Sequence, residues 1–398
     1  MPSRTQPVPV TPAVLKWARE LRGYSIGKAA ELLKVSRTLL EEIERGDSPV
    51  STTTFHRMLT VYQQTESVLL LPNTPDWDPW PQDFRTGGNL RAALLPETRM
   101  AIREARRYQH AMSDLREDYA EAFAKASLRA ATIEDDPEDT ARRERRRFGL
   151  TIAEQRKWHL TTDEPFRMWR ARAQALGILV LLKSMPWDDC RGISLRGNGL
   201  IPVIIVNSND REAARSFTLF HEYGHLLLNE SAACILQSEN QTRQARIERW
   251  CNRFAAAFLM PPDEVRELVA LHIGDKPRSH WTLANVSRLA TLLKVSVTSM
   301  ALRLKELDIT NVYDTEANIL FRDRREPRKN KSSGSSGGPA PATVRLSEVG
   351  ASAAAVVLRA LSNRAIDSRQ AAEILDLGAG QLREFASRAQ QQSRDAPP

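Results

Sequence analysis

The stretch FTLFHEYGHLLLN, residues 217–229, decides how the rest of the chain is interpreted. It contains two histidines, His221 and His225, four residues apart, with Glu222 directly after the first. On a helix, residues i and i+4 lie one turn apart on the same side, so both imidazoles can reach one point. The apolar residues around them favour a buried helix, on which such polar groups carry a desolvation cost unless a partner satisfies them. The stretch therefore predicts a buried helix whose polar residues share a partner.

A tetrahedral zinc ion fits this spacing. Histidine nitrogen is a common zinc ligand, with a bond length of about 2.0–2.1 Å. Glu222 lies one step around the helix, beside an open fourth position for water, so it can take that water's proton and return it to the leaving amine. The alternative, a helix with surface histidines, disagrees with the apolar residues on both sides. We expect Zn²⁺ bound by His221 and His225, and Mn²⁺ as a second metal that supports activity.

A third protein ligand has to come from another element. Glu248 follows His225 by 23 residues and lies in the predicted helix ARIERWCNRFAAAFLM. Three other carboxylates compete with it: Glu230 follows the first helix too closely, Glu239 is in an expected loop, and Asp263 follows two prolines. A surface carboxylate near a helix start is an equally good interpretation of Glu248. The residues alone therefore leave the third ligand open.

The two motifs together resemble the ImmA/IrrE family of zinc metallopeptidases. The family pattern is H-E-x-G-H followed by E-x-x-A-N-x-F-A-A-x-L-L-M-P, and this chain has HEYGH and then ERWCNRFAAAFLMP, with Cys251 in place of the usual alanine. The resemblance implies that His221, His225 and Glu248 are the metal ligands and that Glu222 is the catalytic base. It extends over residues 10 to about 310, and the tail from Leu346 resembles a C-terminal module of longer members.

Cys251 has two interpretations, because it lies three residues after Glu248. A thiolate at this place can reach the metal and hold the enzyme inactive until it is oxidised or displaced. The alternative is an ordinary buried cysteine in the helix core. Rates of hydrolysis that stay unchanged in Cys251→Ala, with and without oxidant, would exclude the switch.

Residues 11–70 predict a bundle of short helices. Ser25 and Ser36 can cap the second and third helices, and Gly46 ends the third. Two helices joined by a short turn, the second ending in Glu-x-Gly, indicate a helix-turn-helix. The resemblance implies that this domain is of the Xre type.

DNA contacts in this domain are predicted from the third helix, residues 36–46. Arg37, Thr38 and Glu42 occupy the positions that face base edges in helix-turn-helix proteins. Residues 11–72 carry eight Lys or Arg and seven Asp or Glu, so their net charge is only 8 − 7 = +1. Because attraction to phosphates dominates affinity for DNA, docking onto another protein is an equal alternative.

Composition bounds the class of protein. The chain has 398 residues, of which 41% are hydrophobic, and its net charge of +8 permits nucleic-acid contact without requiring it. No apolar run reaches the 18 or more residues of a membrane span, and the N-terminus has no apolar segment typical of a secretion signal. Three cysteines do not make a disulfide framework. We expect a cytoplasmic protein without membrane contact.

The predicted fold class is α+β and mainly helical. It combines an N-terminal helix-turn-helix bundle, a zincin-like metallopeptidase core with a small sheet, and helical C-terminal units. A long polar helix is expected from 97 to about 131, and strands at 177–183, 191–197 and 202–208. The last strand, PVIIVNS, is expected to be an edge strand that holds an extended substrate beside the zinc helix.

The expected domains run in chain order. They are a Xre-type helix-turn-helix domain (1–72), a Pro/Trp-rich connector (73–98), a zincin-like metallopeptidase domain (99–278), a small helix-turn-helix-like unit (279–321), a flexible basic Ser/Gly linker (322–345) and a C-terminal helical module (346–398).

The function that the resemblance implies is regulatory proteolysis. A zinc-dependent endopeptidase would cleave a partner protein, a Xre-type transcriptional repressor, in a stress, phage or mobile-element switch. The alternative is an antitoxin-like or transcriptional regulator that binds DNA through its N-terminal domain, or a cognate toxin, with little or no protease activity. The intact Glu222 and an open fourth coordination position favour catalysis, because structural zinc sites are normally closed.

Overall fold

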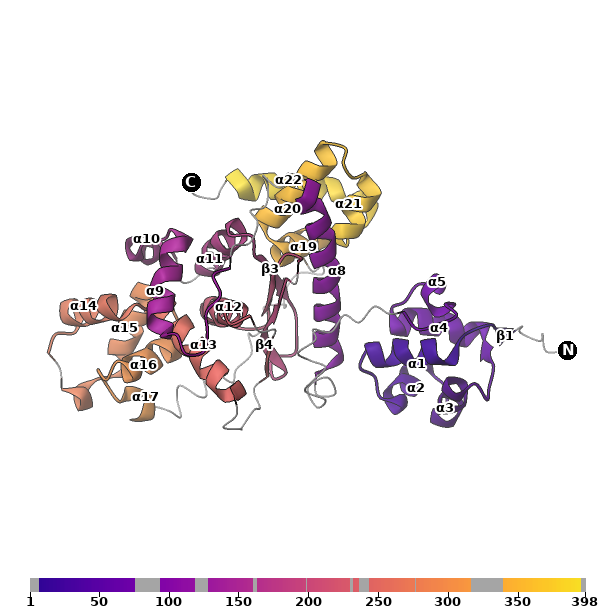
Figure 1. The fold of residues 1–398 in the computed structure, drawn as a ribbon, viewed down its shortest axis with the longest axis horizontal. Helices are drawn as coiled ribbons and strands as arrows, with labels where there is room; N and C mark the ends of the chain where they lie inside the picture. Colours follow the sequence, from indigo (N-terminus) through magenta and orange to yellow (C-terminus); the bar gives the residue numbers. More distant parts are fainter. Residues whose placement is uncertain are drawn as a thin grey trace. The chain divides into compact units, whose positions relative to one another are not determined.

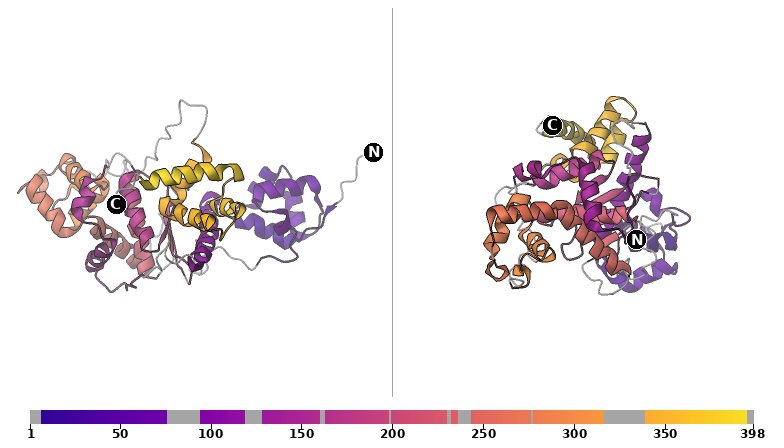
Figure 2. Two further views of the ribbon diagram at one scale, coloured as in Figure 1. Left: turned by 90° about the horizontal axis from the view of Figure 1, so that it is seen from above. Right: turned by 60° about the vertical axis from the view of Figure 1, so that its left-hand side comes forward.

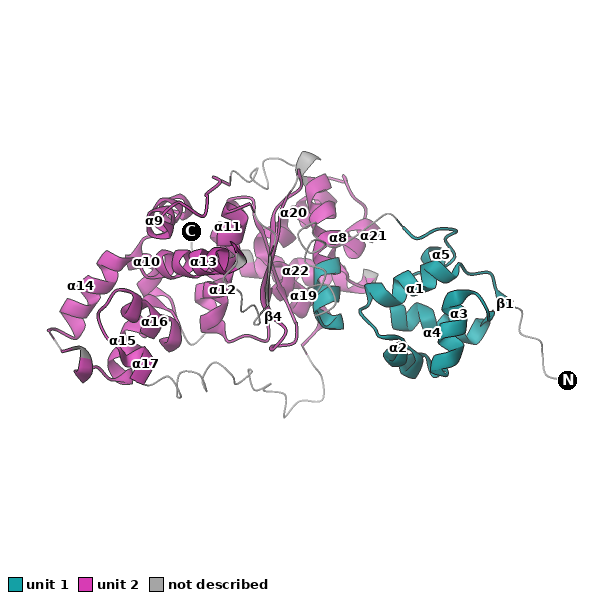
Figure 3. Ribbon diagram, turned by 60° about the horizontal axis from the view of Figure 1, so that its bottom comes forward, with its two compact units in different colours: residues 1–103 teal, residues 104–398 magenta. Residues whose placement is uncertain are grey.

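A computed structural model describes the chain at residues 7–75, 94–118, 128–159, 163–197, 199–229, 232–235, 243–275, 277–315 and 339–394. The chain forms two compact units, Met1–Arg103 and Glu104–Pro398 (Figure 3). The division falls within helix α8 (Pro96–Asp118). Most of the predicted connector and linker, at 76–93 and 316–338, lies outside the described residues.

The first unit is a bundle of short helices. Its elements are β1 (Pro7–Val8), α1 (Pro12–Leu21), α2 (Ile26–Leu33), α3 (Arg37–Arg45), β2 (Val50–Ser51), α4 (Thr52–Tyr62) and α5 (Glu66–Leu69). The side chains of Ser25 and Ser36 accept hydrogen bonds from the first turns of α2 and α3, as predicted. The unit has a core of its own, which includes the fully buried Leu15, Leu33 and Leu40.

The second unit is built on one small sheet with helices around it (Figure 1). Before and within the sheet it has α9 (Pro137–Phe148), α10 (Ile152–Lys157), α11 (Glu164–Ala175), β3 (Leu179–Lys183), β4 (Cys190–Leu195), β5 (Val203–Asn207), α12 (Glu212–Leu227) and β6 (Ala232–Ile235). After the sheet come α13 (Arg243–Leu259), α14 (Pro262–His272), η1 (Arg278–His280), α15 (Leu283–Leu293), α16 (Val297–Glu306) and α17 (Val312–Thr315). The last group is α19 (Pro341–Val349), α20 (Ala351–Ser362), α21 (Ser368–Leu375), η2 (Ala379–Gln381) and α22 (Leu382–Arg394). The predicted α+β, mainly helical class is confirmed.

The strand order corrects one prediction. The sheet runs β3-β5-β4-β6, with β3 parallel to β5 and the other neighbours antiparallel. Ile204 of β5 pairs with Val180 on one side and with Ser194 on the other. The prediction that PVIIVNS is an edge strand is therefore wrong, because both of its backbone edges are already hydrogen-bonded within the sheet. The edge strands of the described sheet are β3 and β6.

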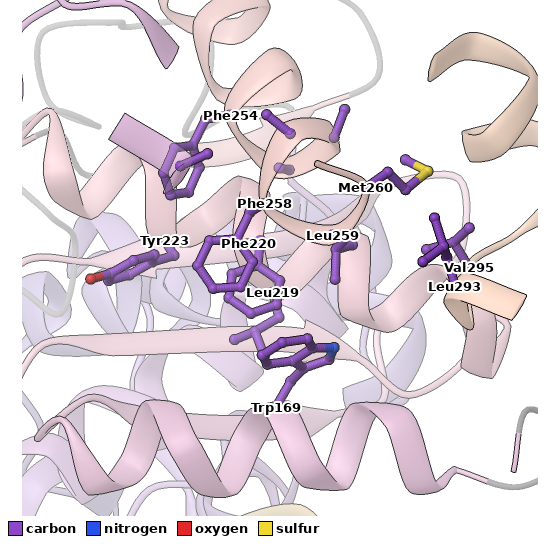
Figure 4. Close-up of a cluster of buried hydrophobic side chains, with 14 of the residues drawn as sticks. Trp169, Leu219, Phe220, Tyr223, Phe254, Phe258, Leu259, Met260, Leu293 and Val295 are labelled. Carbon is purple, nitrogen blue, oxygen red and sulfur yellow. The ribbon is translucent and has the colours of Figure 1, made fainter. Parts of the chain in front are cut away.

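A cluster of aromatic side chains holds α12 against α13 (Figure 4). The rings of Phe220 and Phe258 stack with centroids 3.8 Å apart, and Trp169 of α11 packs edge-on against both. Burying a phenylalanine side chain contributes about 1.5–3 kcal/mol. The apolar residues beside the histidine motif are thus the residues that fix the motif's helix in the core.

The first part of the helix predicted to run from 97 to about 131 is described as α8 (Pro96–Asp118). Residues 119–127 are outside the described residues, and 128–131 are not helical. The N–H of Ala131 instead donates to the carbonyl of Leu227, at 2.8 Å, and so satisfies an acceptor at the C-terminal end of α12. The end of the predicted range is therefore not helical, because Ala131 donates its backbone N–H to α12 rather than within its own segment.

The C-terminal helices belong to the same unit as the sheet. Helix α19 begins at Pro341, so the last five residues of the predicted linker are helical. It packs on the edge strand β3, and α20 packs on α11. Figure 2 shows these C-terminal helices in yellow. Buried charges join these layers: Lys183 of β3 contacts Glu104 at 2.6 Å and Glu348 at 2.8 Å. The guanidinium of Arg170 also donates to the carbonyl of Ser347, at 2.7 Å.

The predicted small unit at 279–321 shares its core with the helices of the metal-binding motif. Leu289 and Leu293 of α15 and Met300 and Leu304 of α16 are buried in one cluster with Phe220 and Phe258.

Among the described residues, no helix is both long and apolar enough to cross a membrane.

Candidate metal centre

The motif helix α12 is buried on nearly all sides. It lies on strands β4 and β5 with one face and against α13 with another. At Gly224 the two helices approach closely, since a Cβ there would lie 3.1 Å from the sulfur of Cys251 and 3.3 Å from its Cα. A glycine facing a small residue therefore lets the two backbones come together and brings the first half of α13 beside the histidines.

Three side chains meet at this crossing. The Nε2 atoms of His221 and His225 are 3.1 Å apart. Glu248 of α13 places one carboxylate oxygen 3.2 Å from Nε2 of His221 and the other 3.5 Å from Nε2 of His225. One ligand atom from each residue lies within 4.8 Å of the others, and both histidines are buried. The residues that sequence reasoning selected are therefore brought together by the fold.

The donor set fits a tetrahedral zinc ion. Two nitrogen ligands with bonds of about 2.0–2.1 Å lie about 3.3 Å apart around such an ion. The observed separation of 3.1 Å between the two Nε2 atoms is close to that value. Two imidazoles and one carboxylate are also the set found in catalytic zinc sites, where a fourth position stays open.

Asn252 orients the first histidine. Its Oδ1 lies 3.0 Å from Nδ1 of His221. Donation from the Nδ1 proton to this oxygen leaves Nε2 with its lone pair directed at the cluster. Sequence reasoning gave Asn252 no role, although its position one turn after Glu248 was a signal that it lies on the same face of α13.

Electrostatics couples the three residues. Burial by itself lowers the pKa of His221, but the hydrogen bond that His221 donates to Glu248 and the charges of Glu222 and Glu248 raise it, and the net pKa lies above the ordinary value. Burial raises the pKa of Glu248, whereas the hydrogen bonds from His221 and His225 lower it by more, so its net pKa lies well below the ordinary value. His221, His225 and Glu248 together therefore form a site that favours positive charge.

Glu222 of α12 lies against β4, next to Gly192. It is fully buried, and this burial raises the pKa of its carboxyl to about 8, while the charge of His221 acts in the opposite direction. A Cβ added to Gly192 of β4 would lie 2.8 Å from Oε1 of Glu222 and 2.6 Å from Thr218. Gly192 is therefore the residue that leaves room for this carboxylate, and sequence reasoning missed it because a glycine in a strand does not indicate which side chain faces it.

The other predicted residues have separate locations. Glu230 and Glu239 lie outside the described residues, and Asp263 is an exposed residue in the first turn of α14, outside the cluster. Cys251 is fully buried against Gly224, and it is not one of the clustered ligand atoms in the described part of the chain. Its proposed switch stays a prediction.

The predicted DNA contacts lie on α3. Arg37 and Thr38 are exposed, and Glu42 is half-buried. Nε of Arg37 is 2.8 Å from a carboxylate oxygen of Glu41, so this cation is paired within its own helix. Such pairing weakens the attraction to phosphate that the net charge of this domain already makes small.

Comparisons with known proteins agree with this division of the chain. Residues 173–305 match the family model of the IrrE N-terminal-like domain, a metallopeptidase-type family, and residues 13–70 match a helix-turn-helix domain. No curated protein and no solved structure matches the chain. The histidine motif, Glu248 and the sheet all lie within the first match. The chain therefore joins a helix-turn-helix domain to an IrrE N-terminal-like domain, as the resemblance of its motifs predicted.

Proposed function

We propose that the chain is a zinc-dependent endopeptidase that cleaves a partner protein, with His221, His225 and Glu248 as metal ligands and Glu222 as general base. The convergence of the two Nε2 atoms and the Glu248 carboxylate at one point, beside a fully buried glutamate, carries this proposal. The partner protein in this proposal is a Xre-type repressor, and its cleavage is regulatory. The helix-turn-helix domain in the same chain supports this choice.

The residues of the chain divide the chemistry between them. When bound, the zinc ion supplies positive charge that acidifies water, polarises a peptide carbonyl and lowers the pKa of Glu222. The carboxylate of Glu222 takes a proton from the attacking water and delivers it to the amine of the leaving peptide. Asn252 holds His221 in the tautomer that keeps Nε2 free. The packed aromatic cluster keeps the helix carrying both histidines in place.

The substrate binds in an extended form along β6. This strand is at one edge of the described sheet, pairs with β4 on its inner side and lies next to α12. An edge strand offers backbone N–H and C=O groups to an added strand, and such pairing holds a peptide straight without fixing its sequence. In this arrangement, β6 holds the extended substrate, which is the role that we expected for β5.

The test is a pair of substitutions that both remove activity but differ in their effect on metal binding. Purified protein, loaded with Zn²⁺ or Mn²⁺, is incubated with candidate Xre-type repressors encoded by genes near its own, and new termini are identified by mass spectrometry. Glu222→Gln should keep one metal ion per chain and lose cleavage by about 10²–10⁴-fold. Glu248→Gln should lose the metal as well as the activity.

A second candidate function follows from the helix-turn-helix match. An antitoxin-like or transcriptional regulator would use the same fold to bind DNA or a toxin, with the metal centre idle. Cleavage by neither the unsubstituted chain nor Glu222→Gln, together with equal binding of DNA or toxin by both, would favour this second function over the peptidase.

A further inference from the structure

Three helix pairs in the chain share one turn geometry: α2–α3, α15–α16 and α21–α22. The turn after the first helix comprises residues 34–36, 294–296 and 376–378, and in the third pair the short helix η2 (Ala379–Gln381) then leads into α22. The first residue of each turn has a left-handed backbone, with φ of 57° at Lys34, 59° at Lys294 and 53° at Asp376. The N–H of the second residue returns to a buried alanine carbonyl of the first helix, in the pairs Val35–Ala30, Val295–Ala290 and Leu377–Ala372. Sequence reasoning identified the first two pairs and missed the third.

The first and third pairs also agree in sequence. Residues 25–33 read SIGKAAELL and residues 367–375 read DSRQAAEIL. Ser25 and Asp367 cap the two helices in the same way, each accepting from the N–H three residues later. The fourth residue after each turn is buried: it is Leu40 in α3 and Leu382, the first residue of α22. The C-terminal pair therefore repeats the turn, the helix cap and the first buried position of the N-terminal pair.

In the middle pair, the corresponding side of α16 is buried. Thr298 and Ala301 of α16 are buried, and so is Arg303. The guanidinium of Arg303 contacts the carboxylate of Glu138 at 2.6 and 2.8 Å. Packing within the second unit thus uses the side of α16 that would otherwise read a partner.

Charge separates the two pairs with exposed faces. Helix α3 carries Arg37 and Arg45 against Glu41, Glu42 and Glu44, a net of 2 − 3 = −1. Helix α22 carries Arg383, Arg388 and Arg394 against Glu384, a net of 3 − 1 = +2. Five residues after the turn, Glu41 in the first pair corresponds to Arg383 in the third, and Arg383 is exposed. The C-terminal face therefore has the sign that a polyanion requires.

In the part of the chain that the structure describes, the other charges on α21 and α22 leave two arginines without an ion pair. Arg369, exposed in the first turn of α21, stands where the first pair has Gly27. Within the described residues, the side chains of Arg369 and Arg383 have no ion pair. Two acidic neighbours are already occupied, because Asp376 is 3.6 Å from Arg107 and Glu384 is 2.8 Å from Arg388. Glu373 remains as an exposed acid on α21.

We propose that α21 and α22 form a second DNA-binding helix-turn-helix, whose ligand is double-stranded DNA. Helix α22 enters the major groove with Arg383 toward the base edges, and the start of α21 meets the phosphate backbone through Arg369. Helix α22 packs against α19, α20 and α21, so the buried stripe of Leu382, Phe385 and Ala389 leaves its opposite side open. This interface does not depend on peptidase activity.

Fluorescence anisotropy with the full chain tests the proposal. The probe is a labelled duplex of mixed sequence, about 30 base pairs long, titrated between about 50 and 200 mM salt, because phosphate contacts act on any sequence. The double variant Arg369→Ala, Arg383→Ala should bind about tenfold more weakly or worse, with a salt slope reduced by about 1 through loss of the phosphate contact of Arg369. The matched control, Lys34→Ala with Arg37→Ala on the first pair, should change affinity less than about twofold.

Each outcome decides the question. Thermal unfolding that is unchanged in both double variants shows that they fold, as expected for exposed residues. Loss of affinity in the C-terminal variant supports the interface. Equal binding by that variant and the unsubstituted chain overturns it, whether or not the control loses affinity. A protein partner that binds through Arg383, with no affinity of the chain for the duplex, also overturns it and makes the surface a protein-docking face.

Discussion

At the scale of single residues, the centre depends on a glycine that carries no functional group. A Cβ at position 192 would lie 2.8 Å from the Glu222 side chain and 2.6 Å from Thr218, which is closer than real Cβ contacts. Gly192→Ala should therefore displace the carboxylate and lower kcat by about 10²–10⁴-fold, the contribution of a general base. Zinc content should stay at one ion per chain, because the atoms nearest to the added Cβ belong to Thr218 and Glu222 and not to the three ligands. A variant that retains full kcat would contradict the assignment of Glu222.

Asn252 makes the opposite kind of contribution, to metal affinity rather than to proton transfer. Its Oδ1 accepts from Nδ1 of His221 at 3.0 Å. Loss of such an outer partner costs about 10–100-fold in metal affinity. We expect that weakening in Asn252→Ala, measured by competition with a zinc chelator. The control is Arg253→Ala, an exposed neighbour on the same helix whose removal should leave affinity unchanged.

At the scale of elements, strand β6 provides a test of the substrate path. Adjacent residues in a strand direct their N–H groups to opposite sides, and proline removes this donor. Of the two variants Ala233→Pro and Cys234→Pro, one removes an N–H that faces β4 and the other an N–H that faces away from the sheet. The second kind should raise KM for a peptide substrate and leave thermal stability nearly unchanged. Equal loss of stability in both, with KM unaffected, would remove β6 from the proposal.

The elements that sequence reasoning predicted well are those with a local signal. Ser25, Ser36 and Ser296 mark helix starts through their own side chains, and the spacing of His221 and His225 defines a helical face without any tertiary information. Strand order was not predicted, because a β-branched run indicates a strand but not its neighbours. Those neighbours, β3 and β4, are set by contacts between segments that are distant in sequence.

The C-terminal helix pair α21–α22 was not recognised from the sequence for a related reason. Its turn, Asp376–Leu377–Gly378, lies in an alanine-rich tail whose overall composition indicates only helix. The left-handed φ of 53° at Asp376 is what makes the turn recognisable, and this angle is not encoded by a glycine at that position. The similarity of AAELL and AAEIL was the available signal. A short match of this kind indicates a repeated motif only when the geometry of both turns is known.

At the scale of the whole molecule, two units with separate cores should respond to metal separately. The candidate centre lies wholly in Glu104–Pro398, and Met1–Arg103 has its own buried cluster. A ligand that binds only the folded state stabilises it by about 2.7 kcal/mol at 100 times Kd. Since each kcal/mol shifts Tm by about 2–4 °C in a unit of this size, zinc should raise the larger calorimetric transition by about 5–10 °C. The smaller transition should stay fixed, and a chelator should reverse the shift. Glu248→Gln should abolish the response, whereas equal shifts in both transitions would show that the metal acts outside the centre described.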